Sequence, residues 1–289
     1  MNIALTGSSG LIGSLLLNDL RSLGHSILCI SSSKSLHDSN IYSYNEVLEG
    51  NLKFNADCLF HLASLNSNLS EADIIKEISL SSKAIKCMEA LNCKKIIFFS
   101  SIKVYGDNSF ELKTYDEKSS LQPSCFYGSA KKQCEDFISR EAVKCNFNYT
   151  IFRLPPLLIN HPDSNLGKIF QVIERGWPIP SFRIGDSNQR SFLSYDTLLE
   201  VMTAVSEDVH KLNNETINLN IPQPISTNHL YKIIGKKVGK KVTIIYLPDF
   251  LFRLMMRANR LQLLLCRIFG HHYISNTKLK NNFSLTHDL

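Results

Sequence analysis

Short apolar runs alternate with longer amphipathic stretches over the first half of the chain. The runs predict five buried strands: Ile3–Thr6, Ser26–Ile30, Cys58–Leu62, Lys95–Ser100 and Tyr149–Arg153. Between the runs, apolar residues recur every three or four positions, which predicts helices at Leu11–Leu23, Glu71–Leu91 and Tyr127–Asn146. This alternation is typical of βαβ units, so we expect an α/β fold with a doubly wound parallel sheet over residues 1–155.

The alternation breaks after Pro155 and Pro156. Proline, glycine and asparagine interrupt the chain as far as Asn188, which predicts a smaller C-terminal α/β lobe for the substrate. We expect this lobe to comprise residues 156–187 and 221–289, with 188–220 returning to the first domain. The expected elements here are helices at Tyr195–Asp208 and Thr227–Val238 and a strand at Val242–Tyr246.

A basic amphipathic stretch runs from Asp249 to about Phe269. On a helix, one stripe carries apolar residues: Phe250, Leu251, Leu254, Met255, Leu261, Leu265 and Ile268. Four arginines lie largely off this stripe: Arg253, Arg257, Arg260 and Arg267. We expect a core-facing helix of the second lobe, with peripheral membrane contact as the alternative. The repeated arginines exclude a transmembrane span.

The composition is that of a folded globular protein, with 44% apolar and 20% charged residues in a chain of 289. The net charge of +6 suits an anionic partner, but no Lys/Arg block interleaved with aromatic residues indicates nucleic acid. The first residues do not resemble a secretory signal, and the eight cysteines are scattered without a CxxC pair. We therefore expect a cytoplasmic protein with reduced thiols. His271 and His272 lack a third ligand at a suitable spacing, so we expect no metal.

A glycine-rich turn follows the first predicted strand and opens the first predicted helix. Gly7 and Gly10 permit a tight turn and close approach to a pyrophosphate, and Gly13 permits close packing of the helix on the strand. The position predicts a Rossmann-type dinucleotide site. Its expected contacts in this turn are Gly7, Ser9, Gly10, Leu11, Ile12 and Gly13.

The end of the second predicted strand bears on the choice of dinucleotide. Sites for NAD place an acidic residue here to hold the ribose 2′-hydroxyl. This chain has Ser31-Ser32-Ser33-Lys34 instead. Hydroxyls and a cation at Ser32 and Lys34 favour NADP(H), and NAD(H) remains the alternative.

Tyr127 and Lys131 stand four residues apart at the start of a predicted helix, so their side chains share one face. A nearby ammonium favours the phenolate form of a tyrosine, which makes the pair a usable acid and base. Ser101 follows the preceding strand, at the sheet edge where doubly wound folds bind ligands. Its hydroxyl is suited to hydrogen-bond a reacting oxygen.

Six motifs occur in the order found in extended short-chain dehydrogenases/reductases and cover about the first 200 residues. They are the glycine turn at 7–13, His61-Leu62-Ala63, Ser100–Gly106, Tyr127–Lys131, Arg153–Pro156 and Arg190–Asp196. The chain thus resembles the NAD-dependent epimerase/dehydratase family of nucleotide-sugar enzymes. Within it, SSIKVYG, RLPPLL and GWPIPSF are most similar to the 4-keto-sugar reductases that make UDP-N-acetylquinovosamine, alongside UDP-sugar 4-epimerases.

The resemblance implies roles for individual residues. Ser101, Tyr127 and Lys131 would form the catalytic triad, and Lys131 would also hold the nicotinamide ribose. Leu62, Ala63 and Pro155 would complete the cofactor contacts. Ser101 and Lys103 would contact the substrate. Asn165 would contact its nucleotide, and Arg190 would contact its diphosphate, because a guanidinium can donate two hydrogen bonds to phosphate oxygens.

The implied activity is reduction of a 4-keto-6-deoxy nucleotide sugar with NAD(P)H, in biosynthesis of surface polysaccharide such as O-antigen. A second interpretation is a 4-epimerase acting on a UDP-sugar or a lipid-diphosphate-linked sugar. A third is a dinucleotide-binding module without catalysis. The substrate would be a nucleotide-diphosphate sugar, and the expected assembly is a homodimer.

The sequence departs from the family pattern in several places. The Asp-containing stretch that brackets the adenine is not recognisable in Tyr42–Asn55, and a family Asn corresponds to Ser79. Ile159-Asn160-His161 replaces a Tyr-Gly-Pro turn, and the chain stops at 283–289, where relatives continue into a final helix. We expect these departures to affect cofactor affinity and substrate binding.

Overall fold

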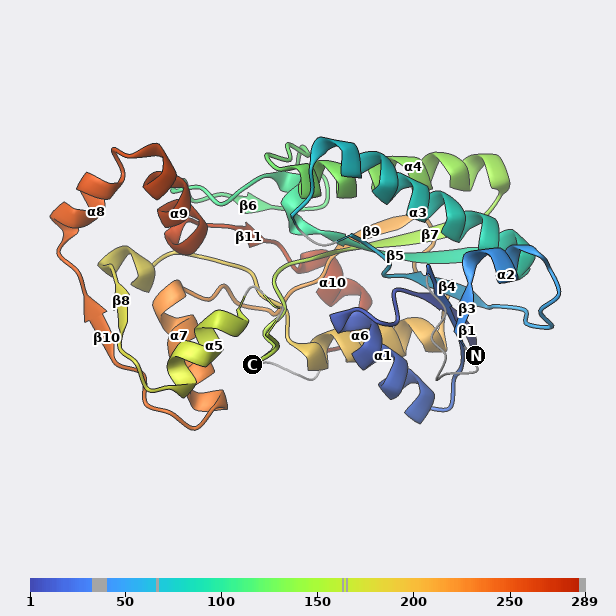
Figure 1. Cartoon of the computed structure of the whole chain (residues 1–289), viewed down its shortest axis with the longest axis horizontal. Helices are drawn as coiled ribbons and strands as arrows, with labels where there is room; N and C mark the ends of the chain where they lie inside the picture. Colours follow the sequence, from blue (N-terminus) through green and yellow to red (C-terminus); the bar gives the residue numbers. More distant parts are fainter. Residues whose placement is uncertain (33–40, 66–67, 163, 165, 286–289) are drawn as a thin grey trace. The chain divides into compact units, whose positions relative to one another are not determined.

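The computed structural model describes residues 1–32, 41–65, 68–162, 164 and 166–285 (Figure 1). The chain folds into two compact units. Unit 1 comprises Met1–Gly106, Ser120–Arg153 and Leu199–Ile217, and unit 2 comprises Asp107–Ser119, Leu154–Leu198 and Asn218–Leu289. The segment 107–119 thus belongs to unit 2, whereas the sequence prediction kept it within 1–155. The segment that rejoins unit 1 is also shorter than the predicted 188–220.

Unit 1 is built on a seven-stranded sheet with the strand order β3-β2-β1-β4-β5-β7-β9. The strands are β1 (Asn2–Thr6), β2 (Ser26–Ser31), β3 (Ile41–Ser43), β4 (Cys58–His61), β5 (Lys95–Ser101), β7 (Asn148–Leu154) and β9 (Glu215–Asn218). The four pairings from β3 to β5 are parallel. The expected doubly wound α/β sheet is confirmed, and the five predicted strands agree with it to within one residue at each end.

Helices cover both faces of this sheet. In Figure 1, α3 (Glu71–Ala90) and α4 (Phe126–Cys145) lie on one face, and α1 (Leu11–Ser22) and α6 (Tyr195–Glu207) lie on the other. Because both faces are covered, every residue of the central strand β5 is buried, including its apolar run Ile96–Phe99. The core on the α3 and α4 side includes Leu59, Met88, Phe98 and Ile138.

Strand β3 and the short helix α2 (Tyr44–Leu48) were not predicted. Ser43 and Glu46 form a capping box at the start of α2, each side chain bonding to the backbone N–H of the other. This S-x-x-E spacing is a sequence signal for a helix start. The helix is only five residues long, so it has no periodicity to reveal it.

Unit 2 contains two small parallel sheets. Strand β8 (Ile179–Ser181) pairs with β10 (Ile244–Tyr246), and β6 (Thr114–Tyr115) pairs with β11 (Tyr273–Ile274). The helices include α5 (Gly167–Glu174), α7 (Thr227–Lys237) and α10 (Thr277–Asn282), and short 3-10 turns occur at Ile102–Tyr105 in unit 1 and Arg183–Asp186 here. Helices α5 and α7 share an apolar core that contains Phe170, Phe192, Leu230 and Ile234.

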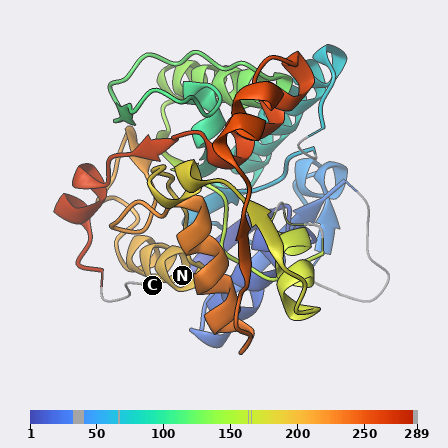
Figure 2. The ribbon, with the colours of Figure 1, turned by 90° about the vertical axis from the view of Figure 1, so that its left-hand side faces the viewer.

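The stretch 249–269 forms two helices, α8 (Asp249–Met255) and α9 (Asn259–Phe269), with a break between them (Figure 2). The expected single core-facing stripe is therefore wrong. Leu265 and Phe269 are buried, but Phe250, Leu254 and Leu261 are exposed. The break interrupts the helical periodicity, so a single stripe does not continue from α8 into α9. Within the described ranges, no helix is long and apolar enough to cross a membrane.

Candidate active site

The glycine turn between β1 and α1 has the geometry that close approach requires. Gly7 has φ of +77°, a conformation that favours glycine, and its carbonyl accepts a hydrogen bond from Gly10 N–H at 3.0 Å. A Cβ on Gly13 would lie 2.1 Å from Gly7 O, and one on Gly7 would lie 2.6 Å from Ala63 N. The backbone at 7, 13 and 63 is thus packed so closely that side chains are excluded.

The start of α1 fits a dinucleotide phosphate. Gly10 is the N-cap, no side chain caps the helix, and its first turn contains no acidic residue. The first amides of a helix have no intrahelical acceptor, so their N–H groups and the helix dipole favour an anion. Ser9 and Gly10 are exposed, and Leu11 and Ile12 are half-buried. This part of the chain therefore fits the cofactor that the sequence implies.

The other expected cofactor residues follow the carboxyl ends of neighbouring strands. Thr6 of β1 pairs in register with Ile30 of β2 and with His61 of β4. Ser32 follows β2, and the half-buried Leu62 and Ala63 follow β4. Because these strands are parallel, their carboxyl ends form one edge of the sheet, where doubly wound folds bind ligands.

The remaining expected cofactor and substrate contacts include one residue of unit 2 and two residues that the structure does not describe. Pro155 is buried directly after β7, in unit 2. Lys34 and Asn165 lie outside the described residues.

Tyr127 and Lys131 both lie on α4, which begins one residue earlier than predicted, at Phe126. The Lys131 ammonium nitrogen is 5.9 Å from the centre of the Tyr127 ring and 5.0 Å from that of Phe98. Gly128 lies between the pair in sequence, and a Cβ there would be 2.4 Å from Lys103 O. The missing side chain lets the first turn of α4 pack directly on the segment that follows β5.

Ser101 is the last residue of β5 and lies in that same region. It is 8% exposed, and its hydroxyl oxygen accepts a hydrogen bond from Lys103 N–H at 3.3 Å. This bond leaves the hydroxyl proton of Ser101 available to donate. Lys103 is half-buried in the turn that follows.

Lys131 forms a buried ion pair that the sequence interpretation missed. Its ammonium nitrogen is 3.2 Å from a carboxylate oxygen of Glu77 on α3, and the two side chains are 3% and 2% exposed. Burial alone would lower the pKa of Lys131. Tyr127 and Glu77 outweigh burial and raise the pKa of Lys131 above its ordinary value, so the lysine stays a cation.

Glu77 is fixed by two further hydrogen bonds. Its carboxylate accepts from the Ser64 hydroxyl and from Leu65 N–H, the latter at 2.8 Å. The two residues belong to the segment that follows Ala63. Glu77 thus connects the Lys131 ammonium to the loop after β4.

A chain of buried polar groups runs beside this ion pair. Thr6 Oγ1 is hydrogen-bonded to His61 Nδ1 at 2.7 Å, and His61 Nε2 is hydrogen-bonded to Ser81 Oγ at 3.1 Å. Burial, with a smaller contribution from Lys131, lowers the pKa of His61 to about 3, so this imidazole is neutral. Ser79, the position matched to a family Asn, is exposed, and Ser81 is the buried serine of α3.

A second buried ion pair lies behind the site. Arg153 at the end of β7 donates two hydrogen bonds from Nε and one from Nη2 to the carboxylate of Glu135, at 2.6 to 3.2 Å. Arg153 Nη1 also donates to the hydroxyl of Tyr105 at 2.9 Å, and Ser100 donates to Glu135. These bonds connect α4 to β5 and β7, so they fix the helix that carries Tyr127 and Lys131.

Sequence reasoning did not identify Glu77 or Glu135. Both occupy positions on the inward faces of their helices, where apolar residues such as Ala84 and Ile138 also lie. A charged residue within the apolar stripe of a helix was therefore the available signal. Glu135 is also four residues after Lys131, on the same helical face.

Arg190 lies in unit 2 and is half-buried, with few partners for its charge. Its Nη1 donates to the carbonyl of Ile268 at 3.1 Å, and its guanidinium carbon is 5.2 Å from the centre of the Phe192 ring. Burial lowers the pKa of Arg190 to about 10, which still leaves it charged near neutral pH. Within the described ranges, no carboxylate forms an ion pair with it. A guanidinium in this state is suited to an anionic ligand.

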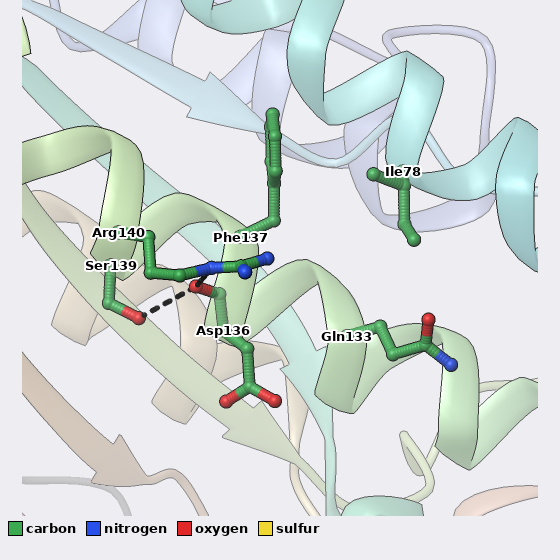
Figure 3. Close-up of a pocket in the computed structure, with 6 residues that line it drawn as sticks. All are labelled: Ile78, Gln133, Asp136, Phe137, Ser139 and Arg140. Carbon is green, nitrogen blue, oxygen red and sulfur yellow. Dashed lines mark hydrogen bonds between the residues drawn. The ribbon is translucent and has the colours of Figure 1, made fainter. Parts of the chain in front are cut away.

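Two surface depressions lie elsewhere in unit 1. One, of about 440 Å³, is lined by α3 and α4 residues that include Ile78, Phe137 and Arg140 (Figure 3). The other, of about 410 Å³, includes Ser26 and Ile27 at the amino end of β2. Neither contains a residue that the sequence assigned to the site.

His271 and His272 belong to the hydrogen-bond network of unit 2. His271 Nδ1 accepts from Gln189 N–H at 3.0 Å, and His272 Nδ1 is 3.1 Å from Asn108 Oδ1. In the part of the chain that the structure describes, no cluster of three His, Cys, Asp or Glu residues is arranged to hold a metal.

Comparisons with known proteins agree with this fold. Residues 3–220 match the NAD dependent epimerase/dehydratase family. The UDP-glucose 4-epimerase of Vibrio cholerae is 21% identical over 269 residues, which cover 88% of this chain and 80% of that protein.

Two solved structures illustrate the similarity in fold. A UDP-N-acetylglucosamine 4-epimerase from Bacillus cereus has a TM-score of 0.76 at 18% identity, covering 97% of this chain and 91% of the other. A human epimerase family protein crystallised with NADPH has a TM-score of 0.74 at 15% identity, covering 98% and 94%. From the match over most of its length, this chain belongs to the NAD dependent epimerase/dehydratase family.

Proposed function

We propose that this protein is an NAD(P)-dependent enzyme acting at C4 of a UDP-sugar, and that it is a 4-epimerase. The observation that carries the proposal is the arrangement in unit 1. The glycine turn, the Ser101 hydroxyl and the Tyr127–Lys131 pair all belong to the carboxyl side of one parallel sheet. Membership of the epimerase/dehydratase family and the 4-epimerases among its relatives support the same function.

The proposed chemistry moves one proton and one hydride at C4. Tyr127 as phenolate removes the proton of the C4 hydroxyl, and later returns it to the same oxygen. Ser101 donates a hydrogen bond to that oxygen. A bound nicotinamide dinucleotide supplies the hydride acceptor and donor for C4.

Lys131 keeps a positive charge beside Tyr127 throughout this cycle. Glu77 holds the ammonium in place, and the raised pKa of Lys131 keeps it protonated near neutral pH. The positive charge stabilises the phenolate and so supports its action as a base. In unit 2, the half-buried guanidinium of Arg190 is the proposed contact for the diphosphate.

Incubation with UDP-glucose and with UDP-N-acetylglucosamine tests the proposal. We expect the C4 epimer of at least one to form, as measured by NMR of the sugar. Tyr127→Phe is expected to lower kcat by about 10²- to 10⁴-fold, the usual contribution of an acid/base group. Tyr149→Phe, a half-buried tyrosine on β7, is the matched control.

A 4-keto-sugar reductase is the second candidate, favoured by the sequence around Ser101, Arg153 and Gly176–Phe182. The two activities differ in what happens to the cofactor. An epimerase returns the hydride to the same sugar and keeps its dinucleotide, whereas a reductase consumes it. Stoichiometric NAD or NADP that survives gel filtration would support the epimerase. Consumption of NADPH in the presence of a UDP-4-keto-6-deoxy sugar would support the reductase.

The non-catalytic alternative predicts a different result. A protein that only binds dinucleotide would convert none of these sugars, and Tyr127→Phe would leave its biological activity unchanged. The ion pair of Lys131 with Glu77 argues against it, because a buried charge pair beside Tyr127 has a clear use in catalysis.

We propose that NADP(H) is preferred over NAD(H). Strand β2 ends at Ser31, and the exposed Ser32 follows it, so neither of these two described residues offers a carboxylate to a ribose 2′-hydroxyl. Ser32→Asp would place a negative charge near a 2′-phosphate. The ratio of Kd values for NADPH and NADH should then rise roughly ten-fold or more. Calorimetric titration of both dinucleotides measures the ratio.

We also propose that the protein is a homodimer. Ile75 of α3 is 75% exposed, and Ile78 and Phe137 line the depression on the surface of α3 and α4 (Figure 3). Light scattering during gel filtration should give the mass of two chains. Ile75→Asp together with Ile78→Asp should give the mass of one.

A further inference from the structure

Helices α8 and α9 of unit 2 each have one face that packs inward. Leu251 and Met255 of α8, four residues apart, contact the small apolar cluster formed by Phe182, Leu265 and Phe269. Leu265 and Phe269 are likewise four residues apart on α9 and are 2% and 4% exposed. Phe252 joins the helices, with its ring centre 6.5 Å from that of Phe269. The inward face of each helix is thus defined.

The outward faces of these helices are apolar as well as basic. On α9, Arg260, Leu263, Leu264 and Arg267 have the spacing i, i+3, i+4 and i+7, which places them on one face. Leu263 and Leu264 are 61% and 48% exposed. On α8, Phe250, Arg253 and Leu254 share a face in the same way, with Phe250 65% and Leu254 58% exposed. We call these seven residues the α8–α9 face.

The charge of this region is mainly positive. Residues 249–270 contain four arginines and one acidic residue, Asp249 at the start of α8. Arg253, Arg257, Arg260 and Arg267 are all exposed, and none forms an ion pair with a carboxylate of the described residues. A solvated surface of a helix usually carries both signs of charge and few large apolar residues.

We infer that the α8–α9 face docks on the surface of an anionic lipid bilayer. Exposed leucine and phenylalanine side chains enter the boundary between head groups and acyl chains, while arginines on the same face contact lipid phosphates. Charge complementarity favours this occupant, because a second copy of the face would bring like charges together. Helices α8 and α9 are too short to span a bilayer, so they would lie on its surface.

Co-sedimentation of the full chain with vesicles tests the inference. We expect binding to vesicles of phosphatidylcholine with phosphatidylglycerol, and little binding to phosphatidylcholine alone. Binding should weaken strongly at high salt, because the range of surface electrostatics shrinks as ionic strength rises. The assay contains no sugar or dinucleotide, so its result is independent of the proposed activity.

Two pairs of variants separate the apolar from the electrostatic contribution. The double variant Leu263→Ser with Leu264→Ser should lower the partition coefficient of the protein onto vesicles by at least about ten-fold. The control, Leu112→Ser with Val143→Ser, changes similarly exposed sites outside the face and should leave this coefficient unchanged. The double variant Arg260→Gln with Arg267→Gln should lower the same partition coefficient by about 25-fold, because each arginine near an anionic surface contributes about five-fold to binding. The control of equal charge is Lys236→Gln with Lys237→Gln, two exposed lysines of α7.

Several results would overturn the inference. Equal binding to neutral and anionic vesicles would do so, as would equal losses in the test and control variants. A third result would be that the original chain does not bind vesicles and that Leu263→Ser with Leu264→Ser lowers the molecular mass of the protein in solution. That result would show that a second copy covers the face. Circular dichroism checks that each variant is folded, which is expected because the replaced side chains are exposed.

Discussion

Glu77→Gln would replace the carboxylate that faces the Lys131 ammonium by an amide of the same shape. At the observed separation of 3.2 Å, the attraction of two unit charges is about 5 kcal/mol for an effective dielectric constant of about 20. The glutamine oxygen can still accept a hydrogen bond, which recovers part of this energy. We therefore expect the free energy of unfolding to fall by about 3 kcal/mol, a value typical of breaking a buried pair.

The pair itself is measured by a double-mutant cycle with Lys131→Met. Each single variant leaves one buried charge without its partner, whereas the double variant leaves neither charge. The loss in the double variant should therefore be smaller than the sum of the single losses by at least about 2 kcal/mol. Urea denaturation of all four proteins at neutral pH gives these energies. Ser79→Ala, an exposed site on the same helix, should change stability by less than about 0.5 kcal/mol.

Additive losses within about 0.5 kcal/mol would refute the reasoning, because they would mean that the two charges do not interact in solution. A Glu77→Gln variant as stable as the original chain would refute it as well. Either result would also remove the support that Glu77 gives to the position of Lys131 in the proposed mechanism.

Three further predictions concern Gly13 of the glycine turn, His61 and Arg190. Gly13→Ala should lower the free energy of unfolding by about 1 to 3 kcal/mol and weaken dinucleotide binding in calorimetry, because the new Cβ would lie 2.1 Å from Gly7 O. Gly10→Ala is the milder control, because its Cβ would lie 3.3 Å from the same oxygen. His61 has its pKa lowered to about 3 by burial, against about 6.5 when unfolded, so stability falls as pH drops through this window. Between pH 6.5 and 4 the original chain should lose about 3 kcal/mol more than His61→Gln in urea denaturation, and equal losses would contradict the assignment. Arg190→Met should raise the KM for a UDP-sugar by about 10²-fold and leave stability equal or higher, because a half-buried cation without a carboxylate partner is removed. An unchanged KM would contradict its role.

Local pattern was enough for much of the fold. Strands β1, β2, β4, β5 and β7 and helices α1, α3 and α4 end within one residue of their predicted bounds. Their apolar runs and periodicity reflect backbone geometry, which neighbouring residues fix. Elements of two to five residues, such as β3, α2 and β6, are too short to show a period and were not predicted.

The sequence predictions were least accurate about which face of a helix is buried. A single stripe over 249–269 assumed one continuous helix, but the break after α8 gives α9 its own inward face at Leu265 and Phe269. Likewise, the sequence did not reveal that the packing of α3 buries Glu77 and Ser81. Which side of a helix is covered depends on partners distant in sequence, so the local pattern alone does not determine it.

By itself, the sequence determined the order of the longer strands and helices of unit 1, the glycine turn, and the positions of Ser101, Tyr127 and Lys131, because spacing along a strand or helix follows from local geometry. Only the tertiary structure decided what surrounds these groups. Glu77 is 54 residues from Lys131 in sequence, yet their side chains meet 3.2 Å apart because α3 packs on α4. The partners of a buried charge come from whichever helices the sheet brings together, and that choice depends on the packing of the whole unit.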